Sequence, residues 1–199
     1  MLQSLLSFDT HLLIWARGLV GPNYATAIQF LGESIVIWSG LYLVGLWLYG
    51  LKAHDNRYKL AALMIFSTII LTFTVYTLIN FGFDKWRPSP QDVVGGIKPL
   101  IPHPLDNSFP SGHALFTGAF LIALFAFARE KSIILITVII GFLTAAARVI
   151  AGVHYPGDII AGWGFGLIGG LLFVRVVSID FMRQKIFFPI IRLIEYIRL

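Results

Sequence analysis

Residues 60–83 read LAALMIFSTIILTFTVYTLINFGF, and no charged side chain interrupts them. A helix needs about 20 apolar residues to cross the hydrocarbon core of a bilayer, so this run is long enough to span a membrane. Four more uncharged runs, each bounded by charge, lie at 34–51, 114–128, 132–147 and 159–174. Lysine and arginine side chains can reach back to water, so the shorter runs can extend by a turn. The sequence therefore predicts an all-α, polytopic membrane bundle of five spans.

The composition agrees with this fold class. Of 199 residues, 57% are hydrophobic and 13% are charged, whereas soluble domains are about 45 to 50% apolar and about 25% charged. Five spans occupy about 100 positions, which leaves room for no sizeable soluble domain, so we predict a single integral-membrane domain over 1–199. The absence of cysteine excludes disulfides and thiolate metal sites.

The two ends of the chain have a mixed character. In residues 2–20 the apolar positions alternate with Asp9, His11 and Arg17, which favours a helix lying in the membrane interface over a sixth span or a cleavable signal. Counting this helix gives six in all. Residues 181–199 show a similar pattern. We divide the chain into an interfacial helix, a catalytic bundle and a cytoplasmic amphipathic tail, at 1–30, 31–177 and 178–199.

The basic residues predict the orientation. The formal net charge is +5, but the cations are scattered rather than gathered in a patch, so we expect anionic lipid and not nucleic acid as the partner. Ten basic residues would lie on one side of the membrane, namely Lys52, Arg57, Lys59, Arg129, Lys131, Arg175, Arg183, Lys185, Arg192 and Arg198. Five would lie on the other, namely Arg17, Lys85, Arg87, Lys98 and Arg148. The richer side is predicted to be cytoplasmic, which leaves the segments 84–112 and 148–158 outside.

Small residues recur at a helical spacing in the last run. Gly162, Gly166 and Gly170 lie four residues apart, so they share one face of a helix. A smooth stripe of this kind favours close packing against another helix of the bundle.

The sequence Pro-Ser-Gly-His at 110–113 stands directly before an apolar run. Ser111 is then expected at or near the N-cap of a helix, with free backbone N–H groups ahead of it. Such an end attracts anions, and Gly112 allows a phosphate to approach the backbone closely. Taken alone, the motif is more typical of a capped helix whose His113 merely lies at the interface.

A second cluster runs from Arg148 to Asp158. Pro156 favours a helix start, and Asp158 falls within its first turn. An aspartate four residues after His154 can orient the imidazole and leave its other nitrogen free to attack. Arg148 is suited to bidentate contact with phosphate oxygens. By itself the segment could equally contain a structural ion pair between Arg148 and Asp158.

The clusters are more informative together than separately. Arg87, followed by Pro88 at the end of a span, adds a cation on the same predicted side. Two arginines, two histidines and one aspartate at three helix ends indicate phosphoryl transfer, with a nucleophile, an acid for the leaving oxygen and cations for the developing charge. A two-metal site would need more carboxylates, so we predict neither metal nor cofactor. The nearby acidic residues are Asp84, Asp92, Asp106 and Asp158.

At these residues the chain resembles the type 2 phosphatidic acid phosphatase superfamily, over about 30–177. Its second motif matches in full at 110–113, and its third matches at Arg148, His154 and Asp158, with Ala147 in place of a serine. Its first motif matches only in Arg87 and Pro88. Asn80 occupies the position of the motif lysine, and Lys85 lies nearby as a candidate replacement.

The resemblance implies a role for each matching residue. His154 would be the nucleophile that forms a phosphohistidine, Asp158 would orient it, and His113 would be the general acid. The remaining matches would bind the phosphate. They are Arg87, Arg148, Ser111 and Gly112, with Lys85 as a further candidate.

Within the superfamily the chain is most similar to the short bacterial undecaprenyl-diphosphate phosphatases of the bacitracin-resistance type. The likeness rests on its length and on Leu-Ile-Pro-His at 100–103 followed by Asp-Asn-Ser-Phe at 106–109, although Gly112 stands where many of those enzymes have aspartate. It implies hydrolysis of the terminal phosphate of undecaprenyl diphosphate at the outer face of the bacterial cytoplasmic membrane. Phosphatidylglycerophosphate, phosphatidate and lipid A remain alternative substrates. Asn80 and Ala147 leave open a catalytically silent transporter or scaffold.

Overall fold

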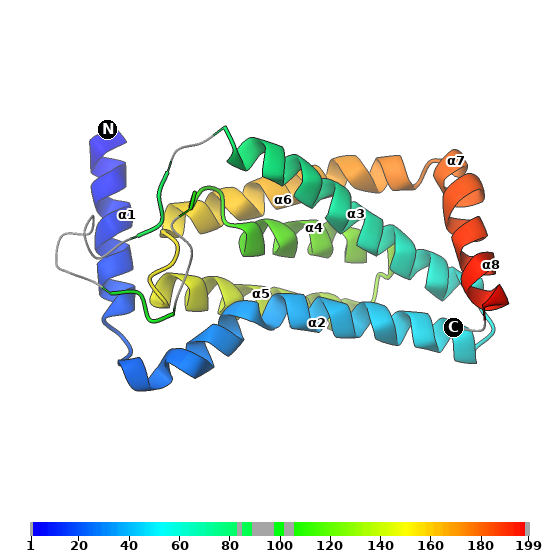
Figure 1. The fold of residues 1–199 in the computed structure, drawn as a ribbon, viewed down its shortest axis with the longest axis horizontal. Coiled ribbons are helices and arrows are strands. Elements are labelled where there is room, and N and C mark those ends of the chain that lie inside the picture. Colours follow the sequence, from blue (N-terminus) through cyan, green and yellow to red (C-terminus); the bar gives the residue numbers. More distant parts are fainter. Residues whose placement is uncertain (1, 83–84, 89–97, 102–105, 198–199) are drawn as a thin grey trace.

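The computed structural model describes residues 2–82, 85–88, 98–101 and 106–197. Five helices run side by side as a bundle, and further helices cross its two ends (Figure 1). The bundle helices are α2 (Ala25–Lys52), α3 (Asn56–Asn80), α4 (Gly112–Phe127), α5 (Lys131–Ile150) and α6 (Pro156–Val177). One end is crossed by α1 (Leu2–Arg17), and the other by α7 (Asp180–Met182), a π-helical turn (Arg183–Phe187) and α8 (Phe188–Tyr196). The predicted all-α bundle is confirmed.

The bundle has the features of a multi-pass membrane protein. Four segments are long and apolar enough to cross a bilayer, namely Pro22–Lys52, Asn56–Asn80, Lys131–Ile150 and Pro156–Val177. Large apolar side chains such as Leu41, Phe142 and Ile160 are more than half exposed on the outer faces of these helices. In water such a surface would be unfavourable, whereas lipid tails solvate it.

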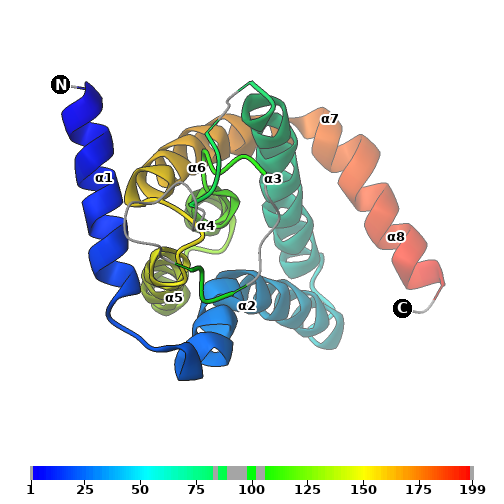
Figure 2. The same cartoon turned by 60° about the vertical axis from the view of Figure 1, so that its left-hand side comes forward.

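The fifth predicted span is shorter than the other four. α4 has 16 residues, about 24 Å at 1.5 Å per residue, which is less than the hydrocarbon thickness of about 30 Å. It packs against α3, α5 and α6, and Figure 2 shows it among these three helices. Because α4 is short and enclosed by its neighbours, its N-terminus and the loop before it can lie nearer to the middle of the bundle than the ends of those helices do.

The bundle begins earlier than the sequence predicted. A 3-10 turn at Pro22–Tyr24 leads directly into α2 at Ala25, so residues 25–30 belong to the first bundle helix rather than to the interfacial segment. The uncharged run begins only after Glu33, and a charge inside an apolar span is unfavourable unless it is paired. Glu33 instead lies within α2, where its carboxylate is paired with side chains of other helices.

The predicted glycine stripe lies against α4, the closest neighbour of α6. A Cβ atom at Gly162 would stand 2.5 Å from the carbonyl oxygen of Ser111, and one at Gly166 would stand 2.1 Å from that of Leu115. At Gly170 it would meet Ile122 at 2.9 Å. No side chain fits at such distances, so the prediction of close packing is confirmed, and the two helix N-termini are held next to each other.

The C-terminal segment packs back on the bundle. Phe187 and Ile191 are buried against Leu60 and Met64 of α3. The ammonium group of the buried Lys59 pairs with Glu195 of α8. The amphipathic character predicted for this tail thus corresponds to one face buried against α3 and one face exposed.

Candidate active site

Three helix ends meet where α1 crosses the bundle. α4 starts at Gly112 with Ser111 as its N-cap, and α6 starts at Pro156 with Asp158 in its first turn. The backbone N–H of Ser111 donates to the carbonyl oxygen of Asp158 at 3.0 Å, which ties the two N-termini together. Arg148 lies in the last turn of α5, beside them. The spatial meeting that the motifs predicted is therefore present.

His154 stands in the short connection between α5 and α6 and is buried. A guanidinium N–H of Arg87 lies 2.8 Å from its Nε2 and can only donate, so Nε2 is the unprotonated nitrogen. Nδ1 then carries the proton and points toward Asp158 Oδ2 at 3.6 Å and Ser108 Oγ at 3.4 Å. The lone pair of Nε2 is thus directed away from Asp158, which is the arrangement that a nucleophilic histidine requires.

The environment of His154 keeps it neutral. Burial lowers the pKa of the imidazole from 6.5 to about 4; the neighbouring Arg87 and Arg148 act in the same direction, and the Asp158 contact opposes them. At neutral pH Nε2 therefore needs no prior deprotonation, and its lone pair accepts the Arg87 N–H.

Asp158 is completely buried and is held by several donors. Its Oδ2 accepts the backbone N–H of Tyr155 at 2.9 Å and the hydroxyl of Ser108, while its Oδ1 accepts Lys85 Nζ at 2.7 Å. Lys85 Nζ also lies 3.3 Å from Asp9 Oδ2 of α1, and the other oxygen of Asp9 accepts Gly157 N–H at 2.7 Å. Asp158 is therefore ionised and fixed in place by charge and by hydrogen bonds.

His113 and Arg148 share one carboxylate. Glu33 of α2 accepts from Arg148 Nη1 at 3.0 Å, and its other oxygen lies 2.9 Å from His113 Nε2. Two nearby polar atoms, Arg148 Nε and Ser111 Oγ, are buried and have no hydrogen-bond partner among the described residues. Buried polar atoms without partners are unfavourable in a resting protein, and here they mark a place that suits an anion.

A cavity of about 420 Å³ joins these groups. Its polar wall consists of Arg87, Gly112, His113, Arg148 and His154. Its apolar wall consists of side chains from α2, α3 and α4, namely Val36, Ile69, Ile70, Phe73, Tyr76 and Phe116. The cavity therefore offers cations and imidazoles at one end and a hydrocarbon surface at the other, as a lipid phosphate requires.

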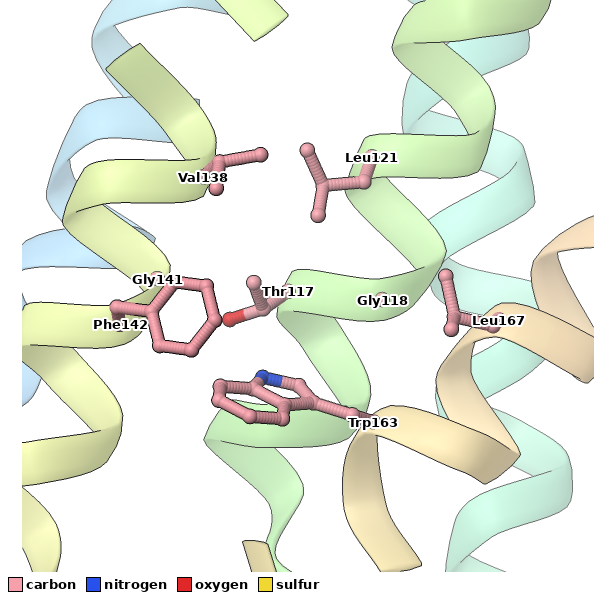
Figure 3. A pocket seen from close by; sticks show the side chains of 8 residues that line it. All are labelled: Thr117, Gly118, Leu121, Val138, Gly141, Phe142, Trp163 and Leu167. Carbon is pink, nitrogen blue, oxygen red and sulfur yellow. The ribbon is translucent and has the colours of Figure 1, made fainter. Parts of the chain in front are cut away.

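A second cavity, of about 200 Å³, lies between α4, α5 and α6 and has no ionisable residue in its wall. Figure 3 shows its largely apolar side chains, with the hydroxyl of Thr117 and the indole of Trp163 as polar groups. It contains none of the motif residues. The larger cavity is therefore the candidate active site.

The sequence-predicted residues divide into three groups. His113, His154, Arg87, Arg148 and Gly112 line the cavity, whereas Ser111 and Asp158 stand directly behind its wall. Lys85 contacts Asp158 and is not among the lining residues. The alternative pairing of Arg148 with Asp158 does not occur, because Arg148 pairs with Glu33. Residues 102–105 of the compared loop, and Asp84 and Asp92, lie outside the described residues.

The two departures from the family motifs have structural roles. The side-chain amide of Asn80 donates to Phe109 O at 3.0 Å, and its backbone carbonyl accepts Asn107 Nδ2 at 2.6 Å. Asn80 thereby holds the loop that leads into α4. Ala147 is buried in an apolar cluster with Ile28 and Val153, so a serine hydroxyl there would need its own partner.

Sequence reasoning missed four polar residues around the site. Ser108 and Asp9 support Asp158, Asp106 pairs with Arg87, and Glu33 joins His113 to Arg148. A lone carboxylate inside an apolar helix is a functional signal in membrane proteins, so Glu33 could have been found from the sequence. The described residues contain no group of three or more histidine and carboxylate side chains arranged to hold a metal ion.

The fold and the site together define a helical membrane protein with two histidines and two arginines on one cavity wall. A family model described as the PAP2 superfamily matches residues 60–181. The chain therefore belongs to the PAP2 superfamily and is a membrane phosphatase of that family.

Similar proteins agree with this family. The chain is 32% identical over 146 residues to the undecaprenyl-diphosphatase BcrC of Bacillus subtilis, covering 73% of this chain and 71% of the relative. It is 28% identical to the lipid A 4'-phosphatase of Bacteroides thetaiotaomicron over 87% of this chain and 78% of the relative. The crystal structure of Aquifex aeolicus LpxE has the same fold, with a TM-score of 0.63 at 21% identity, covering 83% of this chain and 93% of that one.

Proposed function

We propose that this phosphatase removes the terminal phosphate of undecaprenyl diphosphate through a phosphohistidine at His154. The observation that carries the mechanism is that two histidines line the same cavity: His154, whose Nε2 is unprotonated, and His113. The similarity of this chain to the Bacillus subtilis undecaprenyl-diphosphatase, in sequence and in length, supports undecaprenyl diphosphate as the substrate. The apolar wall of the cavity supports a long hydrocarbon chain attached to the phosphate.

The proposed reaction has two steps. In the first, the Arg87 N–H turns from His154 Nε2 to a phosphate oxygen, the freed Nε2 lone pair attacks the terminal phosphorus, the bond from phosphorus to the bridging oxygen breaks, and His113 gives its proton to that oxygen. In the second, water attacks the phosphohistidine, His113 takes a proton from the water, and the nitrogen–phosphorus bond breaks to release inorganic phosphate. Arg87 and Arg148 stabilise the charge on the phosphate oxygens, and Asp158 stabilises the imidazolium that forms. No metal ion enters either step.

A second candidate function is hydrolysis of another lipid phosphate. The similarity to a lipid A 4'-phosphatase over most of the chain favours it. Purified enzyme in detergent should be compared on undecaprenyl diphosphate, phosphatidylglycerophosphate, phosphatidate and lipid A. We expect the highest kcat/KM on undecaprenyl diphosphate, and a higher value on lipid A would move the assignment to the second candidate.

His154→Ala tests the mechanism. It removes the nucleophile, so we expect phosphate release to fall to background, while a chelator such as EDTA leaves the parent enzyme unaffected. His11→Ala, on the exposed part of α1, is the matched control. Full turnover by the His154 variant would exclude a phosphohistidine, and loss of activity in EDTA would reveal a metal that the proposal omits.

The proposed orientation has the site at the outer face of the bacterial cytoplasmic membrane. Its support is the excess of basic residues at the opposite end of the bundle, where Lys52, Arg57, Arg129 and Lys131 lie. Since the chain has no cysteine, a single cysteine at His54 or at Trp86 can report the topology. A membrane-impermeant thiol reagent should label the position at Trp86 in intact cells and leave that at His54 unlabelled, and the reverse pattern would invert the orientation.

A further inference from the structure

Glu33 makes an unusual pair of contacts. Its two carboxylate oxygens bind different side chains, with Oε1 at 3.0 Å from Arg148 Nη1 and Oε2 at 2.9 Å from His113 Nε2. Both partners line the cavity, and both belong to the machinery proposed above. The carboxylate therefore bridges the proposed general acid and a proposed phosphate-binding arginine, in the manner of an anionic ligand.

A substrate phosphate and Glu33 compete for at least one of these donors. Arginine has five N–H donors and can bind two anions at once. The Nε2 of His113 carries a single N–H, which can serve one acceptor at full strength. The bridging oxygen of the substrate cannot receive the Nε2 proton while Glu33 accepts it, so for proton transfer from Nε2 the contact between Glu33 and His113 must open before the first chemical step.

Glu33 is the partner that is free to move. Its side chain is 44% exposed, whereas that of Arg148 is 9% exposed. Arg148 also packs against α2, since a Cβ at Gly32 would stand 3.3 Å from its Cδ. A displaced Glu33 carboxylate can turn toward the open side, while the guanidinium keeps its place on the cavity wall.

We propose that Glu33 is a specificity-determining residue whose carboxylate binds the cavity-lining donors of His113 and Arg148 and competes with phosphate for them. An incoming substrate displaces the carboxylate, aided by the many contacts of its lipid chain. The product, inorganic phosphate, has no such chain, and the returning carboxylate expels it. Glu33 thus weakens the binding of free phosphate and favours phosphate that is attached to lipid.

This inference rests on the proposed function, and its test is binding rather than turnover. Glu33→Gln keeps the shape of the side chain and removes its charge. We expect the dissociation constants of inorganic phosphate and of orthovanadate, measured by isothermal titration in detergent, to fall roughly tenfold relative to the parent. Glu130→Gln, an exposed site at the far end of α5, removes the same charge and should leave both constants unchanged.

Other outcomes distinguish a failure of the proposed competition from a failure of the proposed function. If Glu33 merely orients His113, the Gln variant binds both anions no more tightly than the parent and loses kcat, and that result would overturn the competition. Glu33→Asp keeps the charge but shortens the side chain, and it serves as the second variant. Its dissociation constants for both anions should lie between those of the parent and those of the Gln variant. If the parent hydrolyses no lipid phosphate, the proposed function fails, while the titrations still decide whether Glu33 competes with anions.

Discussion

Asp158 is held in place by residues that do not line the cavity. The buried carboxylate is surrounded by Ser108, the Tyr155 backbone and Lys85. Lys85 joins it to Asp9, and its ammonium group also lies 4.5 Å from the ring centre of Tyr155. An aspartate with so many donors stays ionised and keeps one orientation, and this in turn fixes the tautomer of His154.

Lys85→Met tests the role of this lysine. The structure favours action through Asp158, so we expect kcat to fall by about tenfold or more while KM changes little. Lys52→Met, exposed at the opposite end of the bundle, is the matched control. A raised KM with unchanged kcat would instead mean that Lys85 binds phosphate directly, as the sequence predicted.

The lowered pKa of His154 has a consequence for stability. The folded value of about 4 lies below the unfolded value of 6.5, so between these pH values the unfolded chain binds more protons than the folded one. Stability should therefore be full above pH 6.5 and decrease as the pH falls toward 4, by about 3 kcal/mol in total.

Thermal unfolding in detergent between pH 7 and pH 4 measures this effect. His154→Gln lacks the titrating group, so its Tm should decline less steeply than that of the parent over the same range. Parallel Tm curves for the two proteins would show that His154 is not buried in its neutral form.

At the scale of elements, the contact between α4 and α6 positions the site. Both N-termini carry site residues, and the backbone of Ser111 binds that of Asp158 directly. The glycine face of α6 allows this approach. A single methyl group added on this face would push α4 and α6 apart and move Asp158 and His154 away from His113.

Gly166→Ala should be severely destabilising, because its Cβ would lie 2.1 Å from the carbonyl oxygen of Leu115. Overpacking of this kind typically costs about 1 to 3 kcal/mol, and here backbone atoms must move. Gly164→Ala is a matched control on the same helix, where a Cβ would have no atom within 4 Å. The difference in Tm between the two variants measures the effect, and equal Tm values would mean that α4 and α6 are not in contact at this point.

At the scale of the whole molecule, local patterns predicted much of the structure. The uncharged runs correspond to α2–α6, and the Pro-Ser-Gly-His motif begins α4. The motif residues also meet at one end of the bundle. These features depend on periodicity and on helix capping, which act over a few neighbouring residues.

The contacts made by Glu33, Asp9 and Asn80 could not be predicted from the sequence. Each depends on the rotation and depth of one helix relative to another, as in the contact of Glu33 with residues 113 and 148. Side-chain packing determines these quantities, and no local pattern encodes it. The position of Glu33 is hard to predict for a second reason: an unpaired charge usually ends a span, whereas its pairing with residues 113 and 148 lets the helix continue.

The crosswise helices bear on how the protein responds to bilayer thickness. α1 and α8 run across opposite ends of the bundle (Figure 1), with exposed apolar residues such as Trp15 on the first and Leu193 on the second. Two such helices would oppose vertical sliding of the bundle if each lay in its own headgroup layer. Hydrophobic mismatch would then be taken up by tilting or by local deformation of the lipid. The end of the bundle that holds the cavity would keep its depth in membranes of different thickness.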